Sequence, residues 1–364
     1  MNVIKFTFLK YINFILLFIR GYLISYFLTY EKYAAWGIVM FVISYHSIAG
    51  FGIPKIVLTK LKDNNSQKFS SNLLGTSVFY IFLLCIIFLI LFRFSQIFIE
   101  WNINEQFSVE SLIILSALLL INDSFVNAAR YKKLYNLIII TESISIIPLI
   151  VLLIIFGENI KVDQCIYIMI FSISFSTLIY YIFVKLRFKV QNIIPYLNLI
   201  KNLGIPLLFF NYASYIIFIL LRYFVLEKYD DQVISNFNFG WFISNAIVMG
   251  ISTVTWYFYP MLLKNLKESN KKNKFSFDDL YYLQLVVSLF LVIVSIPFFK
   301  YFTYNFYDKF ELSLIHFRFV LISQLIFYLS TYPSSFLIAN DKKKELILSG
   351  IISALFFGLY VYVK

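Results

Sequence analysis

Long apolar runs recur along this 364-residue chain, and they limit its possible folds more than any other feature. Each is about 20 residues long, which is the length of a helix that crosses a bilayer. Only helices and closed barrels satisfy their backbone polar groups in lipid, and barrel strands would show short alternating segments instead. The runs therefore predict about eleven transmembrane helices, at 11–28, 34–53, 73–92, 109–129, 134–156, 165–184, 203–225, 233–258, 280–299, 313–338 and 346–363.

Composition supports this class, because 61% of the residues are hydrophobic and only 14% are charged. Soluble domains carry about 25% charged residues. The N-terminal run begins with basic residues but has no small-x-small cleavage site, so we interpret it as a retained helix. The segments between runs are too short for an extramembrane domain. We expect an all-α polytopic membrane protein whose function lies between its helices.

The net charge of +12 reflects topology. Most lysines and arginines lie on one set of alternate loops, which places those loops and the N-terminus in the cytoplasm. Nucleic acid is therefore not an expected partner, although anionic lipid head groups are. Cys85 and Cys165 are single cysteines in apolar runs, and His46 and His316 are the only histidines. Nothing predicts a disulfide framework, a zinc site, a cofactor or a catalytic residue.

A basic linker at 185–202 divides the chain into a six-helix bundle at 1–184 and a bundle of about five helices at 203–364. The two bundles contain similar hairpins. Arg20 precedes a Glu-Lys-Tyr turn in the first, and Arg222 precedes one in the second. Both hairpins would start and end in the cytoplasm, so the repeat is parallel, and such bundles hold a substrate between them.

Two stretches carry a resemblance to a known family. One is 27–61, which contains LTYEKYAAW, and the other is 203–266, which contains GIPLLF, a short acidic turn and YPMLLK. They resemble the polysaccharide-transport branch of the MOP exporter superfamily, which includes O-antigen flippases and is similar to the MATE transporters. The resemblance implies a bacterial cytoplasmic membrane protein with two bundles around a central cavity. Because the family has two six-helix bundles, either one run is missed in this count or the second bundle here lacks one helix.

The resemblance also implies a cationic cavity for the pyrophosphate of a lipid-linked sugar. Three arginines lie within apolar runs, namely Arg20, Arg222 and Arg318, and guanidinium groups bind phosphate in a bidentate geometry. Alternatives remain open. Arg20 can snorkel or pair with a buried carboxylate, whereas Arg222, Arg318 and His316 can anchor the outer membrane interface.

Polar side chains also recur every seven residues in the eighth span, at Asn238, Asn245 and Ser252. This spacing keeps them on one helical face. They either bind sugar hydroxyls or join helices through interhelical hydrogen bonds.

Two carboxylates, Glu142 and Asp123, lie within predicted spans. A carboxylate within a bilayer either pairs with an arginine or carries a proton or sodium ion. The similarity to ion-coupled exporters implies a coupling site, for which both residues are candidates. For Glu142, the alternative is a structural ion pair with Arg20.

We therefore expect a flippase that moves an undecaprenyl-pyrophosphate-linked oligosaccharide by ion-coupled alternating access. The alternatives are a multidrug or small-molecule exporter, a non-transporting scaffold, and a polysaccharide polymerase or ligase, which would carry a large outward loop. The expected partners are the lipid-linked saccharide, membrane lipids, a polysaccharide polymerase and a chain-length regulator. We expect the protein to act as a monomer.

Overall fold

The computed structural model describes residues 3–63, 67–98, 107–184, 193–205, 221–226, 228–268 and 277–339, and beyond them positions 342, 344, 345, 348 and 352. Within these residues the chain is helical and has no strand, which confirms the predicted all-helical class. Six helices of the described part are long and apolar enough to cross a membrane. They are Phe8–Phe27, Asn72–Ser95, Val109–Tyr131, Tyr135–Asn159, Val162–Val184 and Gln284–Asn305.

The chain forms two compact units. The first contains Tyr22–Phe209, and the second contains Asn2–Gly21 together with Phe210–Lys364. Helix α1 (Val3–Phe27) contributes to both units. The division into a six-helix bundle at 1–184 and a smaller bundle at 203–364 stays a prediction.

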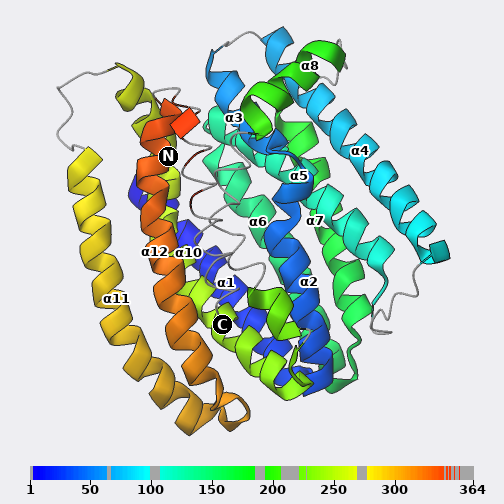
Figure 1. Cartoon of the computed structure of the whole chain (residues 1–364), viewed down its shortest axis with the longest axis vertical. Coiled ribbons are helices and arrows are strands. Elements are labelled where there is room, and N and C mark those ends of the chain that lie inside the picture. The colour runs from blue at the N-terminus through cyan, green and yellow to red at the C-terminus, as the bar shows by residue number, and fades with distance from the viewer. Residues whose placement is uncertain are drawn as a thin grey trace. The chain divides into compact units, whose positions relative to one another are not determined.

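The first unit is built around α5, which contacts α2, α3, α4, α6 and α7 (Figure 1). Two short turns, η1 (Gly157–Asn159) and the π-helical η2 (Ile200–Gly204), complete the described part of the unit. Its helices are α2 (Tyr30–Ala49), α3 (Ile53–Asp63), α4 (Gln67–Phe98), α5 (Val109–Tyr131), α6 (Tyr135–Phe156), α7 (Val162–Val184) and α8 (Ile193–Leu199).

Side-chain caps fix where the helices of this unit begin. The Thr29 hydroxyl accepts a hydrogen bond from Lys32 N at the start of α2, and the Ser108 hydroxyl accepts one from Ser111 N at the start of α5. Such caps satisfy backbone N–H groups that have no partner within the helix. Ser108 N also donates to Asp163 Oδ1 over 3.2 Å, which joins the starts of α5 and α7.

Helix α3 was not predicted, because the sequence analysis treated its region as a loop between spans. Its 11 residues are too few to cross a bilayer. Ile53, Ile56 and Val57 form its buried face. The chain enters α3 through Gly52, whose φ is +72°. A side chain at this position would lie 2.7 Å from the carbonyl oxygen of Gly204, so the close approach of the two backbones requires glycine.

The second unit is built around the contact of α10 (Asp231–Glu268) with α12 (Ser313–Ala339). Helix α11 (Phe277–Phe306) and the turn η3 (Asp308–Phe310) join them. Stacked aromatic rings fill the interior, with centroids 4.4 Å apart for Phe239 and Phe310 and 4.1 Å apart for Phe299 and Phe317. Aromatic stacking adds about 0.5–1.5 kcal/mol per pair beyond burial alone.

Helices α10 and α12 approach each other closely at Gly240. A Cβ atom there would lie 2.9 Å from Phe317 N and 3.1 Å from the carbonyl oxygen of Ser313. One turn later, the Ser244 hydroxyl faces the carbonyl oxygen of Phe317 at 3.4 Å. Small residues four positions apart let helix backbones pack closely in membranes.

Gly240→Ala is expected to destabilise the second unit by about 1–3 kcal/mol, because the atoms that the new methyl group meets are backbone and must move. Thermal unfolding of the detergent-solubilised protein measures this as a lowered Tm. Ser244→Ala is the matched control, since it leaves the contact open and is expected to cost less than about 1 kcal/mol. Equal Tm values for Gly240→Ala and the unaltered protein would contradict the described packing.

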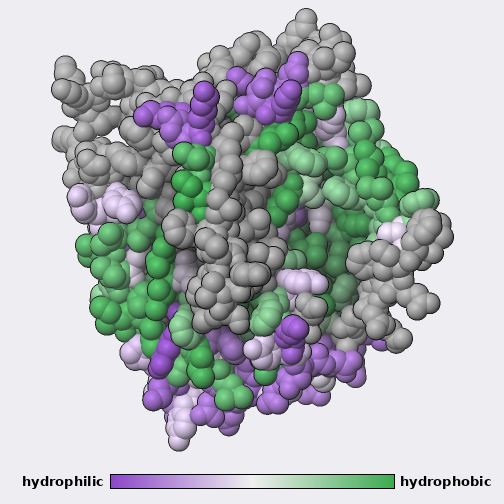
Figure 2. All heavy atoms as spheres, in the orientation of Figure 1, coloured by the Kyte–Doolittle hydropathy of each residue, from purple (hydrophilic) through white to green (hydrophobic). Residues whose placement is uncertain are grey.

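The outward surface of several helices is apolar. On α4 the exposed residues include Phe82, Ile90 and Phe94, and on α11 they include Phe290 and Ile293. Figure 2 shows hydrophobic residues covering α4 and α11. Apolar patches of this extent are not left in contact with water. Together with the six long apolar helices, this surface identifies a multi-pass membrane protein.

Two predicted spans lie partly or wholly outside the described residues. Positions 206–220 of the seventh and nearly all of the eleventh, 346–363, are not described. Positions 185–192 of the linker at 185–202 are also not described, whereas the rest of it lies in α8 and η2. The other predicted spans overlap helices at nearly the expected positions.

Candidate functional site

In the first unit, α2 and α5 bring a histidine against a carboxylate. His46 Nε2 lies 3.1 Å from Asp123 Oδ2, and His46 Nδ1 lies 2.5 Å from the carbonyl oxygen of Ile43. A carbonyl oxygen can only accept, so Nδ1 carries a proton. The contact with Asp123 then holds one further proton, which sits either on the imidazole or on the carboxyl group.

The contact between His46 and Asp123 is favourable only with that proton present. Without it, the lone pair on Nε2 faces a carboxylate, and two acceptors repel each other. The Asp123 side chain is 42% exposed and that of His46 is 15% exposed. Asp123 is eight residues from the end of α5, or about 12 Å of helix. The Asp123 carboxylate is therefore accessible, and the His46 imidazole lies more deeply buried behind it within the predicted span.

Glu142, the other predicted coupling residue, lies in the same region of the first unit. It is seven residues from the start of α6, about 10 Å along the helix. The carboxylates of Glu142 and Asp123 both act electrostatically on the buried hydroxyl of Tyr180 on α7. A hydrogen bond of 2.9 Å from the Ser176 hydroxyl to the carbonyl oxygen of Thr141 joins α7 to α6 beside Glu142. Asp123 on α5 and Glu142 on α6 thus lie on two helices that both pack against α7.

In the second unit, Arg222 is a fully buried side chain, with 2% of its surface exposed. Its guanidinium carbon lies 4.8 Å from the ring centroid of Trp241 on α10. A desolvated cation–π contact contributes about 2 kcal/mol or more. Arg222 was predicted to contact substrate or to snorkel to the membrane surface. The structure holds its charge inside the unit, against an aromatic ring.

One face of α10 collects several of the predicted groups. Asn238, Trp241, Phe242 and Asn245 are three or four residues apart, so they share this face. Asn238 is 6% exposed, and in the described structure its Nδ2 has no hydrogen-bond partner. Asn245 is half-buried. A buried amide of this kind is a ready donor to a ligand.

Helix α1 crosses the same face. Phe18 stacks on Phe242 with ring centroids 5.8 Å apart, and a Cβ atom on Gly21 would collide with the Phe242 ring. The half-buried Arg20 precedes Gly21. Helix α1 and Arg222 therefore contact α10 at neighbouring residues, Phe242 and Trp241.

Other predicted residues lie apart from this face. Arg318 on α12 is exposed, whereas His316 packs edge-on against Phe237 with centroids 5.7 Å apart. Ser252 lies in α10, but its side chain is outside the described residues. Glu142 belongs to the first unit and Arg20 to the second, so their ion pair stays a prediction.

Sequence reasoning assigned no role to His46 or Trp241. His46 is one of only two histidines in the chain, but nothing in the sequence pairs it with a carboxylate 77 positions away. Trp241 is one of four tryptophans in a chain where 21% of residues are aromatic. Only the crossing of helices distinguishes these two from others of their kind.

Apolar helices in two units define a multi-pass membrane protein, and its fold is that of the MATE transporters. No family model matches the sequence, and no curated protein matches it. A MATE in complex with MaL6 has a TM-score of 0.61 at 14% identity, over 94% of this chain and 95% of that one. The outward-facing conformation of a multidrug resistance MATE family transporter of the MOP superfamily has a TM-score of 0.60 at 15% identity, over 94% and 95%.

The inward-facing conformation of a multidrug resistance MATE family transporter of the MOP superfamily also matches. Its TM-score is 0.53 at 15% identity, over 92% of this chain and 94% of that one. Identities this low establish a common fold. The finer resemblance to the polysaccharide-transport branch stays a prediction.

Proposed function

We propose that the protein is an exporter that works by alternating access and moves a lipid-linked oligosaccharide on an isoprenoid pyrophosphate across the bacterial cytoplasmic membrane. The observation that carries this proposal is that the buried Arg222 lies over Trp241, on the face of α10 that also holds the amide of Asn238. A desolvated guanidinium attracts phosphate, and an amide suits sugar hydroxyls. The inward-facing and outward-facing MATE structures support a fold that can open to either side.

Arg20 and Asn245 extend the proposed binding surface along the same face of α10, and the exposed Arg318 is proposed as a contact at its rim. The coupling ion is proposed to be a proton, held by the pair of His46 and Asp123 with Glu142 nearby. We further propose a cytoplasmic N-terminus, as the loop lysines indicate, and a monomer that hands its product to a polysaccharide polymerase and a chain-length regulator.

A multidrug or small-molecule exporter is the second candidate, because the similar structures include multidrug resistance transporters. The positive charge of Arg222 in the proposed binding surface favours anionic cargo. Trp241 is the kind of ring that recognises organic cations, but Arg222 already lies over it and would repel a second cation. The two candidates therefore differ in the charge of the cargo that they bind.

Binding to the purified protein in nanodiscs separates the two. An undecaprenyl-pyrophosphate-linked saccharide is expected to bind at least about tenfold more tightly than ethidium, a difference of about 1.4 kcal/mol. In cells, the gene is expected to restore surface polysaccharide to a flippase-deficient strain. Ethidium resistance in an exporter-deficient strain without restored polysaccharide would instead establish the multidrug function. If the gene neither restores surface polysaccharide nor confers ethidium resistance, a non-transporting scaffold would be favoured.

A further inference from the structure

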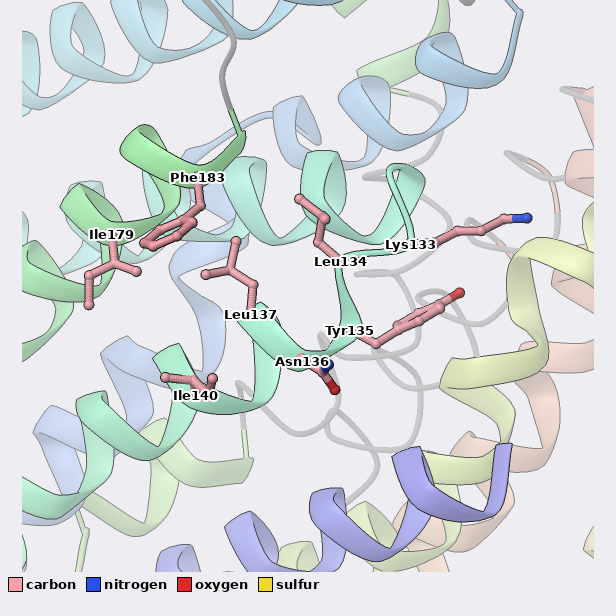
Figure 3. Close-up of a pocket in the computed structure, with 8 residues that line it drawn as sticks. All are labelled: Lys133, Leu134, Tyr135, Asn136, Leu137, Ile140, Ile179 and Phe183. Carbon is pink, nitrogen blue, oxygen red and sulfur yellow. The ribbon is translucent and has the colours of Figure 1, made fainter. Parts of the chain in front are cut away.

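A groove lies on the surface of the first unit, where the turn between α5 and α6 meets the end of α7. Its volume is 540 Å³, within the range of about 300–1,000 Å³ that small-molecule sites occupy. Figure 3 shows Leu137, Ile179 and Phe183 turning toward one another, whereas Lys133 and Tyr135 extend away from them. The groove therefore has an apolar end and a polar, cationic end.

The apolar end opens onto the membrane-facing surface. Ile140 is 54% exposed and Phe183 is 59% exposed. Exposed apolar side chains continue along α6 and α7 in the same direction, among them Ile147, Val151 and Phe175. Ile140 lies five residues beyond Tyr135, so the apolar lining begins about 8 Å along the helix from the polar end. This is the arrangement of a lipid, with a head group at the surface and acyl chains below.

Two adjacent lysines at the polar end have different roles. Lys132 Nζ donates a hydrogen bond of 2.7 Å to the carbonyl oxygen of Val184, which holds the end of α7 against the turn. Burial lowers the pKa of Lys132. The side chain of Lys133 is exposed and extends outward (Figure 3). Lys132 thus shapes the groove, and Lys133 supplies its accessible charge.

The backbone at Lys133 is that of a position normally filled by glycine. Its φ is +58°, Lys133 N donates to the carbonyl oxygen of Arg130, and Leu134 N donates to that of Ala129. This pair of hydrogen bonds closes α5 in a Schellman motif, whose left-handed residue is usually glycine. Lysine is disfavoured there by its backbone, so its presence indicates a use for the side chain.

We propose that this groove binds an anionic phospholipid of the inner leaflet. The phosphate contacts the ammonium of Lys133 and the polar groups of Tyr135 and Asn136, and an acyl chain lies against Leu137, Ile140 and Phe183. Charge complementarity selects the occupant, because the accessible charged group of the groove is a cation and cytoplasmic leaflets are anionic. The proposal rests on the proposed cytoplasmic side of the turn between α5 and α6, and it does not depend on the exported cargo.

Native mass spectrometry of the full-length protein tests the proposal with two probes, phosphatidylglycerol and phosphatidylcholine with the same palmitoyl and oleoyl chains. The unaltered protein is expected to retain phosphatidylglycerol in preference to phosphatidylcholine. Lys133→Gly is expected to weaken that binding about fivefold, the effect of one lysine at a membrane surface. Its Tm is expected to be unchanged or higher, since glycine suits the backbone.

Two further variants complete the test. Lys201→Gln removes another exposed lysine of the same unit and is expected to leave phosphatidylglycerol binding unchanged, whereas Lys133→Gln weakens it. Ile140→Trp, which fills the groove without changing charge, is expected to weaken binding of both lipids. Full binding by folded Lys133→Gly, or equal retention of the two lipids, would overturn the proposal. A third result would also overturn the proposal. If undecaprenyl pyrophosphate displaces phosphatidylglycerol, and Lys133 is required for the binding of both lipids, the groove is a cargo site.

Discussion

Asp123→Asn is expected to reduce export about 100-fold, the upper part of the range for coupling between two ligands on one protein. Asparagine preserves the shape of the side chain and can still hydrogen-bond to His46, but it cannot take up or release a proton. Surface polysaccharide in the flippase-deficient strain and proton-driven uptake in inverted vesicles both measure the loss. Glu158→Gln, at an exposed carboxylate in η1, is the control and is expected to retain full export.

The partner of Asp123 gives a sharper version of this experiment. If His46 and Asp123 share one proton, His46→Gln should lose nearly as much export as Asp123→Asn, and the double variant should lose little more than either. Additive losses would show that the two side chains act separately. Glu142→Gln tests the other predicted carboxylate, and a loss confined to Glu142→Gln would move the coupling site to α6.

Arg222→Met is expected to abolish measurable binding of the lipid-linked saccharide while the protein stays folded. Methionine replaces the buried cation with an apolar side chain that fills much of the same space, and such replacements are often neutral or stabilising. It also keeps a contact with the ring of Trp241. Binding in nanodiscs and the Tm of the same samples separate a lost charge from a lost fold.

Arg222→Lys is the companion variant. Lysine keeps the positive charge but loses the planar guanidinium, so partial binding is expected. Binding in the order arginine, lysine, methionine would support a phosphate contact. Full binding by a folded Arg222→Met would show that Arg222 serves only to pack Trp241, and the proposed cargo surface would then lose its main cation.

The helical class of the protein followed from the sequence because bilayers impose a simple rule. A backbone in lipid must satisfy its hydrogen bonds within each helix, so apolar runs of sufficient length become helices whatever surrounds them. Helices α5, α6 and α7 accordingly begin and end within a few residues of the predicted spans. Helix α3 was missed because it is amphipathic and lies across no bilayer, so its formation depends on the packing of Ile53, Ile56 and Val57.

The sequence allowed the candidate residues to be identified, but it did not allow the side chains that they contact to be identified. Arg222, Asp123 and Glu142 were identifiable because charge is costly at membrane depth and is retained there only for a reason. Their contacts were not identifiable. His46 meets Asp123 through the packing of α2 on α5, and Trp241 meets Arg222 where the segment 221–226 lies against α10.

The sequence by itself determined that this chain crosses a membrane repeatedly as helices, and it predicted which of its charged residues lie at membrane depth. Both depend on local free energies of transfer, which each segment carries with it. Only the tertiary structure decided that His46 lies against Asp123, that Arg222 lies over an indole ring, and that a lysine in a glycine-like turn borders an apolar groove. These contacts join residues on different helices, and the choice of neighbouring helix is a property of packing that no single segment contains.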